Sequence, residues 1–446
     1  MKRGMAAGVQ ARVVIVARDD ALAGPLSEGL DRLGWRTVTA RGAYAAMAAV
    51  ADLQIEAAIV DLSEGAEALD MAQRLKEACA PRRLPVVAIG EPDPSLEARG
   101  FDLTLAAPLH PAQAAMRLET LVRTAVAEEE FELRVETFAE KNRALGVPDS
   151  DNGPYQVLAI GEPAPQFLAL SNALAAHGAE VVGAFTAYTA FDYLHERRFD
   201  AVVLWAGENP QEALSIAAGL RRNTRLYHTP AVLYMRQDSY VTASEAYHRG
   251  ITDVASPETP EAETARRVVE LARAYRRQTS VRQALESART SGLMDAATGL
   301  FTRDLFAAHL ARLAQAAKQR NRALSVCVLK VADKPELAAI RKGGWLGRAI
   351  PQIGSMVGRL VRVEDTAARL GPEVFALALP ATPAAAARAA GERIAAVIGC
   401  TAFEAGDGKP PFVVEFDLGV AEVGPGEPAG RALEQAAAEA YARKAS

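Results

Sequence analysis

Short apolar runs, each about as long as a β-strand, alternate with alanine- and leucine-rich stretches in the first half of the chain. The first runs are residues 13–17 (VVIVA), 57–60 (AAIV) and 85–89 (PVVAI), and residues 21–33 between them have an amphipathic helical pattern. Uninterrupted apolar runs separated by helices are typical of parallel sheets that are buried on both faces. This alternation predicts an α/β fold with a doubly wound parallel sheet.

The same pattern returns further along the chain. Runs at 157–160 (VLAI), 201–205 (AVVLW) and 230–234 (PAVLY) are spaced like the first three, which indicates an internal repeat of about 120 residues. Residues 125–155 are first charged and then rich in Pro, Gly, Asp and Ser, so they predict a helix followed by a linker. The total length of 446 residues suggests about three domains. We expect these domains at residues 10–125, 153–280 and 292–446.

Composition excludes several classes of protein. The chain has 50 basic and 55 acidic residues, a net charge of −5, which argues against a protein that coats nucleic acid or an anionic membrane. The arginine-rich stretch 261–291 is interleaved with glutamates, so we interpret it as a solvated helix face. Three distant cysteines exclude a disulfide framework, and no apolar run approaches the roughly 18 residues of a membrane span. We expect a cytoplasmic protein without a signal peptide.

Three aspartates follow the strands expected in the first domain. Asp19 and Asp20 come just after the first strand, and Asp61 ends the third. Parallel sheets place their sites at the carboxyl ends of strands, and carboxylates suit Mg²⁺. The arrangement resembles the receiver domain of bacterial response regulators. The resemblance implies that Asp61 is the phosphoacceptor and that Asp19, Asp20 and Asp61 hold Mg²⁺.

Both expected sheets depart from the receiver pattern. In the first, Gly90 stands where the family has Thr or Ser, and Ala107 stands where it has the Lys that meets the phosphoryl group. Two readings remain open for this domain: a scaffold kept for its contacts, or a regulator that is phosphorylated on Asp61. In the second, Trp205 replaces the nucleophilic aspartate, so we expect a pseudo-receiver that serves for packing, as a dimerisation or spacer module.

Three motifs mark the third domain. Residues 293–303 read LMDAATGLFTR, residues 362–380 read RVEDTAARLGPEVFALALP, and residues 436–446 read AAAEAYARKAS. In order and spacing they resemble the GGDEF domain of the diguanylate cyclase family. The resemblance implies a nucleotide cyclase-like α+β domain, with Lys444 in the place of a phosphate-binding lysine.

The residues that cyclisation of GTP requires are altered. A cyclase needs two carboxylates for its metals and a tight glycine turn near the phosphates. Lys330 occupies the strand-end carboxylate position, and Ala338 and Gly347 fall near the guanine-contacting positions. Proline at the second signature position removes an amide donor and fixes φ. The degenerate signature consists of Gly371, Pro372, Glu373, Val374 and Phe375.

We therefore expect a protein that is not an enzyme. The alternative from the enzyme class is a weak diguanylate cyclase that uses Glu373 and Asp333. We also expect the glycine-rich stretch 341–348, which replaces the substrate loop of the family, to be a remodelled solvated loop.

One family site is retained. Arg362 and Asp365 stand in the position of the RxxD motif, and Arg393 matches the second arginine of the same site. The resemblance implies that these three residues bind cyclic di-GMP. A guanidinium can pair with a phosphate or with the guanine O6/N7 edge, and a carboxylate can accept from guanine N–H groups. Retained binding beside lost catalysis predicts a receptor for the dinucleotide.

Two receivers followed by a GGDEF domain resemble the PleD type of response regulator, and the altered active site resembles a non-catalytic paralogue of that type. The resemblance implies a homodimeric cyclic di-GMP effector at the cell pole. It also implies protein partners, namely an RcdA-like protease adaptor and the ClpXP machinery, in the regulated proteolysis of the cell-cycle regulator CtrA.

Overall fold

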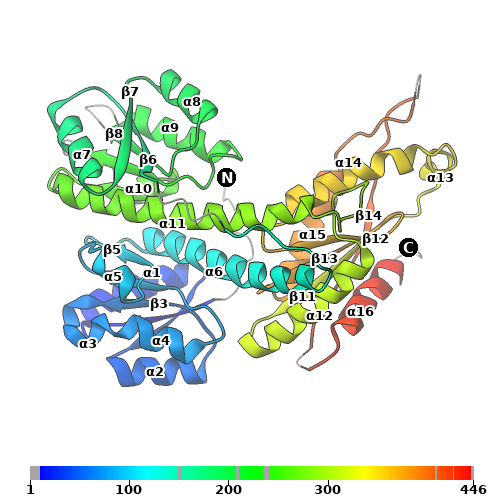
Figure 1. The fold of residues 1–446 in the computed structure, drawn as a ribbon, viewed down its shortest axis with the longest axis horizontal. Coiled ribbons are helices and arrows are strands. Elements are labelled where there is room, and N and C mark those ends of the chain that lie inside the picture. Colours follow the sequence, from blue (N-terminus) through cyan, green and yellow to red (C-terminus); the bar gives the residue numbers. More distant parts are fainter. Residues whose placement is uncertain are drawn as a thin grey trace. The chain divides into compact units, whose positions relative to one another are not determined.

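The computed structural model (Figure 1) describes residues 11–148, 153–206, 210–235, 241–406, 409–424 and 426–442. The first sheet is parallel and has the strand order β2-β1-β3-β4-β5. Its strands are β1 (Arg12–Val16), β2 (Arg36–Ala40), β3 (Ile55–Asp61), β4 (Val86–Ile89) and β5 (Leu103–Leu105). Its helices are α1 (Asp20–Arg32), α2 (Ala43–Asp52), α3 (Ala66–Leu69), α4 (Met71–Cys79), α5 (Ser95–Ala98) and α6 (Pro111–Ala139), with a 3-10 turn at Leu62–Glu64.

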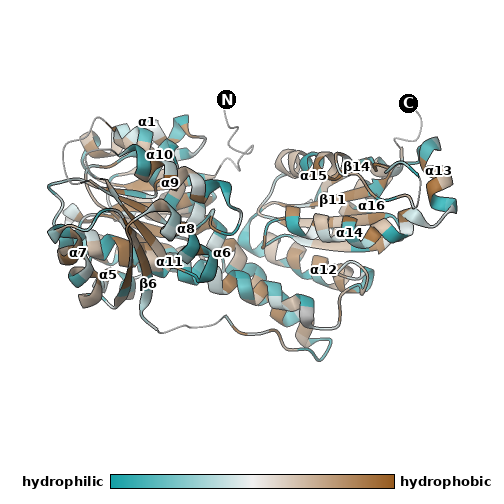
Figure 2. Cartoon of the chain, turned by 90° about the horizontal axis from the view of Figure 1, so that it is seen from above, coloured by the Kyte–Doolittle hydropathy of each residue, from teal (hydrophilic) through white to brown (hydrophobic). Residues whose placement is uncertain are grey.

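The second sheet repeats this topology. Its order, β7-β6-β8-β9-β10, has the same connectivity as the first, and its strands are also parallel. The strands are β6 (Tyr155–Ile160), β7 (Ala179–Ala184), β8 (Ala201–Ala206), β9 (Ala231–Met235) and β10 (Asp253–Ala255). The helices are α7 (Pro165–Ala176), α8 (Ala187–Glu196), α9 (Gln211–Arg222), α10 (Ala243–His248) and α11 (Glu261–Ser287). The predicted parallel sheets are confirmed, and Figure 2 shows the hydrophobic strands around β6 in brown.

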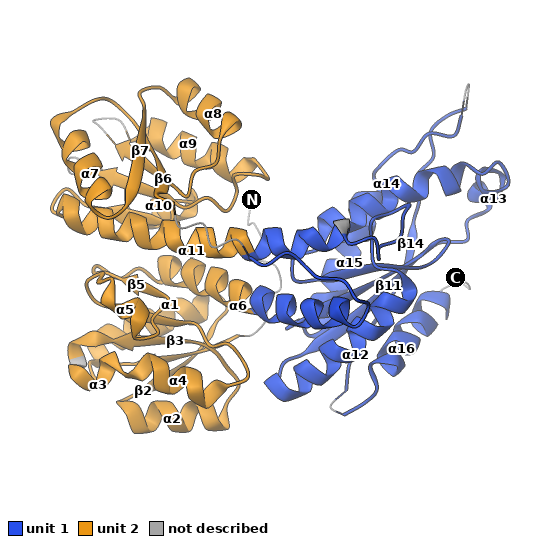
Figure 3. Cartoon of the chain, in the orientation of Figure 1, with its two compact units in different colours: residues 1–9, 126–149, 281–446 blue, residues 10–125, 150–280 orange. Residues whose placement is uncertain are grey.

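The described residues form two compact units (Figure 3). One contains residues 11–125 and 153–280, and the other contains residues 126–148 and 281–442. The division between the units therefore falls within α6 and within α11. Both parallel sheets belong to the unit with residues 11–125 and 153–280, which is unit 2 in Figure 3.

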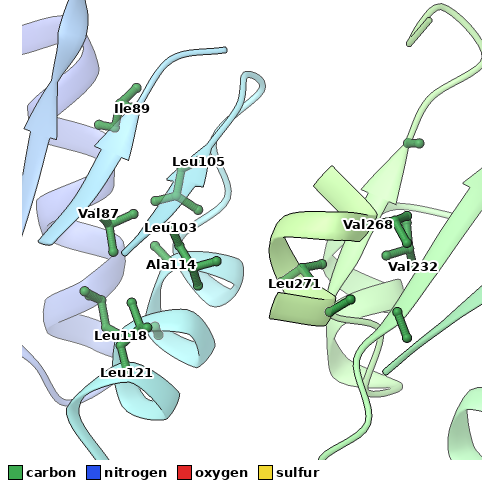
Figure 4. Close-up of a cluster of buried hydrophobic side chains, with 14 of the residues drawn as sticks. Val87, Ile89, Leu103, Leu105, Ala114, Leu118, Leu121, Val232, Val268 and Leu271 are labelled. Carbon is green, nitrogen blue, oxygen red and sulfur yellow. The ribbon is translucent and has the colours of Figure 1, made fainter. Parts of the chain in front are cut away.

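Alternate strand residues pack on opposite faces of each parallel sheet. In β1, Val13 and Ile15 face α1 and α6, whereas Val14 and Val16 face α2 and α4. Figure 4 shows Leu118 of α6 beside the strands of the first sheet, within a cluster that also includes side chains of the second sheet. Burial of apolar area on both faces, worth roughly 25 cal/mol per Å², explains why the strands read as continuous apolar runs.

Buried charges join the two sheets. Arg117 of α6 forms an ion pair with Asp253 of β10 at 2.8 Å, and both side chains are almost fully buried. Arg267 of α11 also faces Asp253, at 3.9 Å, and it pairs with Glu263. The prediction that the arginines of 261–291 form a solvated face is therefore wrong for Arg267, which is 7% exposed. Asp253 requires compensation at this depth, because an unpaired buried carboxylate is costly.

An aromatic cluster fills the strand end of the second sheet. Trp205 is buried, its ring centroid lies 4.8 Å from that of Tyr234, and it also contacts Phe167 at 6.1 Å. Gly161 follows β6 with φ +146°, and a Cβ on it would lie 2.4 Å from the Cβ of Trp205. The tryptophan occupies space that only a glycine at position 161 leaves free.

Substitution Gly161→Ala is expected to destabilise the chain by about 2 kcal/mol, because overpacking and an unfavourable φ add together. Chemical denaturation monitored by circular dichroism measures the change. Gly178→Ala is the matched control, because Gly178 also has a positive φ but meets nothing within 4 Å. Equal destabilisation by both substitutions would contradict the steric explanation.

The other unit, unit 1 in Figure 3, is built on an antiparallel sheet with the order β12-β13-β11-β14. Val326 and Val328 of β11 face α12 and α16, whereas Cys327 and Leu329 face α14 and α15. Burial raises the pKa of the Cys327 thiol to about 12. The strands are β11 (Leu324–Val331), β12 (Thr366–Gly371), β13 (Val374–Pro380) and β14 (Phe416–Glu422). The helices are α12 (Arg303–Arg320), α13 (Pro335–Lys342), α14 (Trp345–Leu360), α15 (Ala384–Gly399) and α16 (Ala429–Ala442), and a 3-10 turn spans Ala288–Thr290.

The prediction of a solvated loop at 341–348 is wrong. This stretch contains the end of α13, two glycines and the start of α14. Gly344 has φ +75°, a conformation that lets the chain leave one helix and enter the next within two residues. Arg348 stacks on Trp345, with 4.4 Å between the guanidinium carbon and the ring centroid. The loop expected from the glycines is a tight helix–helix junction.

Candidate functional site

The aspartates of the first sheet cap local turns. Asp61 is 4% exposed, and its carboxylate accepts hydrogen bonds from the Ser63 backbone at 3.0 Å and the Ser63 hydroxyl at 2.7 Å. Asp19 accepts from the Ala21 backbone at 2.8 Å and caps α1, and Asp20 forms an ion pair with Arg41. In the part of the chain that the structure describes, no three or more His, Cys, Asp or Glu side chains are grouped to hold a metal. Phosphorylation of Asp61 and Mg²⁺ binding there stay predictions.

The degenerate signature forms the hairpin between β12 and β13. Gly371 pairs with Val374, so Pro372 and Glu373 make the connection between the strands. Phe375 is fully buried in the core beneath the sheet. Within this motif, Glu373 is the acidic residue, and it lies at the tip of the hairpin.

Arg341 binds both carboxylates near this hairpin. Its guanidinium forms a fork on Glu373, with Nη2 at 2.8 Å from Oε2 and Nε at 3.2 Å from Oε1. Its Nη1 lies 3.2 Å from Asp333 Oδ1. Hydrogen bonding to Glu373 raises the pKa of Arg341. Forked arginine–carboxylate pairs are among the stronger and more specific polar contacts in proteins.

Lys330 completes this cationic cluster. It lies in β11, opposite Val374, and its Nζ is 3.1 Å from Asp333 Oδ2 and 3.9 Å from Asp417 Oδ2. Each carboxylate that a divalent metal would use here is already next to a lysine or an arginine. A metal would have to displace Arg341 and approach Lys330 against charge repulsion. Ala338 and Gly347, at the expected guanine-contacting positions, are exposed helical residues without polar side chains.

Asp365 shapes the turn that begins at Arg362. Its Oδ2 accepts a hydrogen bond from the Arg362 backbone at 2.9 Å, and its own backbone N–H donates to the Arg362 carbonyl at 3.2 Å. The residue is 8% exposed, and its Oδ1 atom has no hydrogen-bond partner among the described residues. The carboxylate therefore holds the turn from inside, and its direct contact with a guanine stays a prediction.

Burial of Asp365 and the neighbouring charge of Glu364 raise the pKa of Asp365 to about 7, against the opposing effect of the Arg362 hydrogen bond. A carboxyl whose pKa is higher in the folded than in the unfolded state makes the fold lose stability as pH rises through that interval. For Asp365 the loss extends from its ordinary value of 3.8 up to about 7.

Substitution Asp365→Asn is expected to remove this pH dependence. Relative to the parent chain, the variant should be more stable at pH 8 than at pH 5 by at least about 1 kcal/mol, because asparagine carries no charge to bury. Denaturant titrations at both pH values measure the difference. Asn in place of the exposed Asp52 is the control, and an equal pH response of the two variants would count against the buried charge.

Arginines surround the last turn of α14 beside this site. Arg393 of α15 donates to the Leu360 carbonyl at 3.4 Å, and Arg289 donates to the Gly358 carbonyl at 3.2 Å. Arg362 follows the helix by two residues. No hydrogen bond or ion pair joins its guanidinium to another described residue, but its charge lowers the pKa of the Asp365 carboxyl. The structure thus brings Arg362 and Arg393 to the same corner of the domain.

Two nearby arginines of this domain form ion pairs with carboxylates. Arg388, on the same helix as Arg393, lies 2.9 Å from Glu439, and Arg369 lies 3.4 Å from Asp295. Among the described residues, neither Arg362 nor Arg393 forms such a pair. The two guanidinium groups make the corner suitable for an anion, since guanidinium groups bind phosphates through paired donors.

A buried polar cluster next to the turn was not predicted. Glu130 and Arg134 of α6 and His309 of α12 are all buried, and Glu130 Oε1 lies 2.7 Å from Arg134 and 2.9 Å from His309. The available signal was the i,i+4 spacing of Glu130 and Arg134. That spacing is equally typical of an exposed helix face, so it did not indicate burial.

Comparison with known families identifies this domain. The family model described as "Diguanylate cyclase, GGDEF domain" matches residues 292–446. The unit with the antiparallel sheet therefore contains a GGDEF domain, as the motifs predicted. The expected Lys444 of its last segment lies outside the described residues.

Solved structures with similarity to the chain include three GGDEF proteins. The GGDEF domain of FimX from Pseudomonas aeruginosa has 20% identity, covers 34% of this chain and 92% of its own, and has a TM-score of 0.31. The GGDEF domain of DgcB from Caulobacter crescentus, solved with c-di-GMP, has 23% identity, coverages of 34% and 88%, and a TM-score of 0.31. SiaD from Pseudomonas aeruginosa, solved with its activator SiaC, has 22% identity, coverages of 41% and 69%, and a TM-score of 0.32.

The search of curated proteins finds no match to the chain. Within the described ranges, no helix combines the length and the apolar character needed to cross a membrane.

Proposed function

We propose that this protein is a cyclic di-GMP effector whose GGDEF domain binds the dinucleotide without making it. The observation that carries the proposal is the placement of Arg362 and Arg393 at one corner of the domain, with no carboxylate pairing either guanidinium in the described structure. Cyclic di-GMP is a dianion with guanine edges that offer O6 and N7 as acceptors. Both features match the guanidinium groups of Arg362 and Arg393.

The acidic side chains that catalysis would need for metal binding are neutralised by neighbouring cations. Phosphoryl transfer depends on metal ions that neutralise the triphosphate. In this chain Arg341 forms a fork on Glu373, and Lys330 and Arg341 bracket Asp333. This internal compensation supports a domain that does not cyclise GTP.

The effector is proposed to act as a scaffold in regulated proteolysis. The basis is the resemblance to PopA, a non-catalytic paralogue of the PleD type, and it implies delivery of CtrA to ClpXP through the adaptor RcdA. In this role the two parallel sheets would be degenerate receivers that supply protein contacts. Cyclic di-GMP would then favour the form of the chain that engages the adaptor.

Two assays test the two parts of the proposal. The full chain incubated with GTP and Mg²⁺ should leave GTP unchanged; product that disappears in Glu373→Gln would instead establish a weak cyclase. In a reconstituted reaction of ClpXP, RcdA and CtrA, the chain should accelerate CtrA degradation when cyclic di-GMP is present. An unchanged degradation rate with ligand would reject the scaffold role and leave the binding claim to be decided by titration.

A further inference from the structure

A single side chain from α6 supports the turn that carries Arg362 and Asp365. Arg134 Nη2 lies 3.0 Å from the Asp365 carbonyl, 3.3 Å from the Val363 carbonyl and 3.2 Å from the hydroxyl of Thr366. Three acceptors on the turn thus face one guanidinium. Because Arg134 is buried and its fork is rigid, it fixes the path of the backbone between Arg362 and the start of β12.

Arg134 is itself held in place by a buried partner. Glu130, one turn earlier in α6, binds Arg134 Nε at 2.7 Å and accepts from Thr366 at 3.1 Å. His309 of α12 contacts the same Glu130 oxygen at 2.9 Å, and its other ring nitrogen lies 2.9 Å from the Thr137 hydroxyl. The turn is therefore joined to α6 through a closed set of buried hydrogen bonds.

The charge state of Glu130 fits this role. Burial alone would raise the pKa of Glu130, but His309 and Arg134 outweigh it and keep the pKa below its usual value. Glu130 is thus an anion that fixes the orientation of Arg134. Its second carboxylate oxygen has no hydrogen-bond partner within the described part of the chain, and an unpaired buried oxygen costs free energy.

We infer that Arg134 is a positioning residue for the dinucleotide site, and that a ligand bound at the Arg362–Asp365 turn stabilises the packing of residues 126–139 of α6. The inference rests on the proposed function, because it explains how the proposed dinucleotide site is held in place. A ligand that orders the turn orders the three acceptors of Arg134. Coupling of this kind is reciprocal: if the packing of α6 strengthens ligand binding at the turn, ligand binding stabilises the packing of α6 by the same free energy. Bound ligand should therefore protect the backbone amides of α6 from hydrogen exchange.

The test uses the full chain with cyclic di-GMP as the probe. Arg134→Met is expected to weaken binding about tenfold or more, and Arg134→Lys is expected to recover part of that loss because it keeps the charge without the fork. Arg312→Met is the matched control. Arg312 also joins α12 to α6, through Glu136 at 2.9 Å and through Glu140, but it has no contact with the turn.

Hydrogen exchange of the parent chain adds a readout that needs no substitution. Ligand should slow exchange of residues 126–139, and this effect should vanish in Arg134→Met and persist in Arg312→Met. If Arg134→Met does not fold, Arg134→Lys takes its place in both measurements.

The outcomes separate the two claims. The positioning role is overturned if both Arg134 variants bind cyclic di-GMP as tightly as the parent, or if ligand does not change the hydrogen-exchange rate of α6. The binding function would stand in either case. A parent chain that does not bind cyclic di-GMP overturns both claims.

Discussion

An Arg362→Ala variant of the full chain is expected to bind cyclic di-GMP at least about 100-fold more weakly than the parent, because it loses a charge-assisted, forked contact. The Arg362 guanidinium forms no ion pair at contact distance with a described residue, so we expect the loss to appear mainly in the affinity. Its charge also lowers the pKa of the buried Asp365, so the substitution should raise that pKa further. Calorimetric titration measures the affinity, and a thermal melt checks the fold.

Arg393→Ala should show a smaller loss of about tenfold, because it removes the second guanidinium of the same corner. Arg388→Ala is the control for both variants. Arg388 lies on the same helix as Arg393 but is held by Glu439 at 2.9 Å, so its removal should leave the affinity within about twofold of the parent. An Arg362→Ala variant that binds as tightly as the parent would reject the proposed site.

The second large effect concerns the hairpin. A double variant, Lys330→Asp with Arg341→Ala, should bind Mn²⁺ at least about tenfold more tightly than the parent. The substitutions add a carboxylate at position 330 and free Glu373 and Asp333 from their ion pairs with Arg341. Three acidic side chains without a neighbouring cation would then be available to a metal ion. Electron paramagnetic resonance of free Mn²⁺ measures the binding.

A control with the same change of charge separates local from general electrostatics. Lys318→Asp with Arg431→Ala alters exposed side chains on α12 and α16. This control should leave Mn²⁺ binding unchanged. Equal binding by the two double variants, or tight Mn²⁺ binding by the parent, would show that Lys330 and Arg341 do not block a metal site.

Local sequence was sufficient to predict the sheets. The runs at 13–17, 57–60 and 157–160 became β1, β3 and β6, because a strand buried on both faces must be apolar at every position. The hairpin was also predicted from its signature: Gly371 and Val374 pair across the connection as that motif requires. Strands and tight hairpins are determined largely by residues that are close together in the sequence, so a local pattern is enough to predict them.

The partners of charged residues could not be predicted in the same way. Arg341 follows a pattern typical of a solvated loop, yet it binds Glu373, which is 32 residues away. Arg267 reads as part of an exposed helix face, yet it is buried beside Asp253. In both cases the pairing is set by how distant elements pack, and the periodicity of a single helix contains no information about it.

The motif singled out Arg362, Asp365 and Arg393, and binding of a ligand by these residues stays a prediction. The structure brings Arg393 to the corner where the Arg362–Asp365 turn begins. The burial of Asp365 and its support by Arg134 arise from α6, a helix more than 200 residues earlier in the chain; the separation from Arg134 to Asp365 is 231 residues. The hydrogen bonds from Arg134 to this turn can be seen only in the folded chain.

Calorimetric titration of the full parent chain with cyclic di-GMP tests the central claim most directly. The account predicts saturable binding with a Kd of about 10 μM or tighter. An absence of saturable binding up to about 1 mM ligand, with the chain shown to be folded, would contradict it.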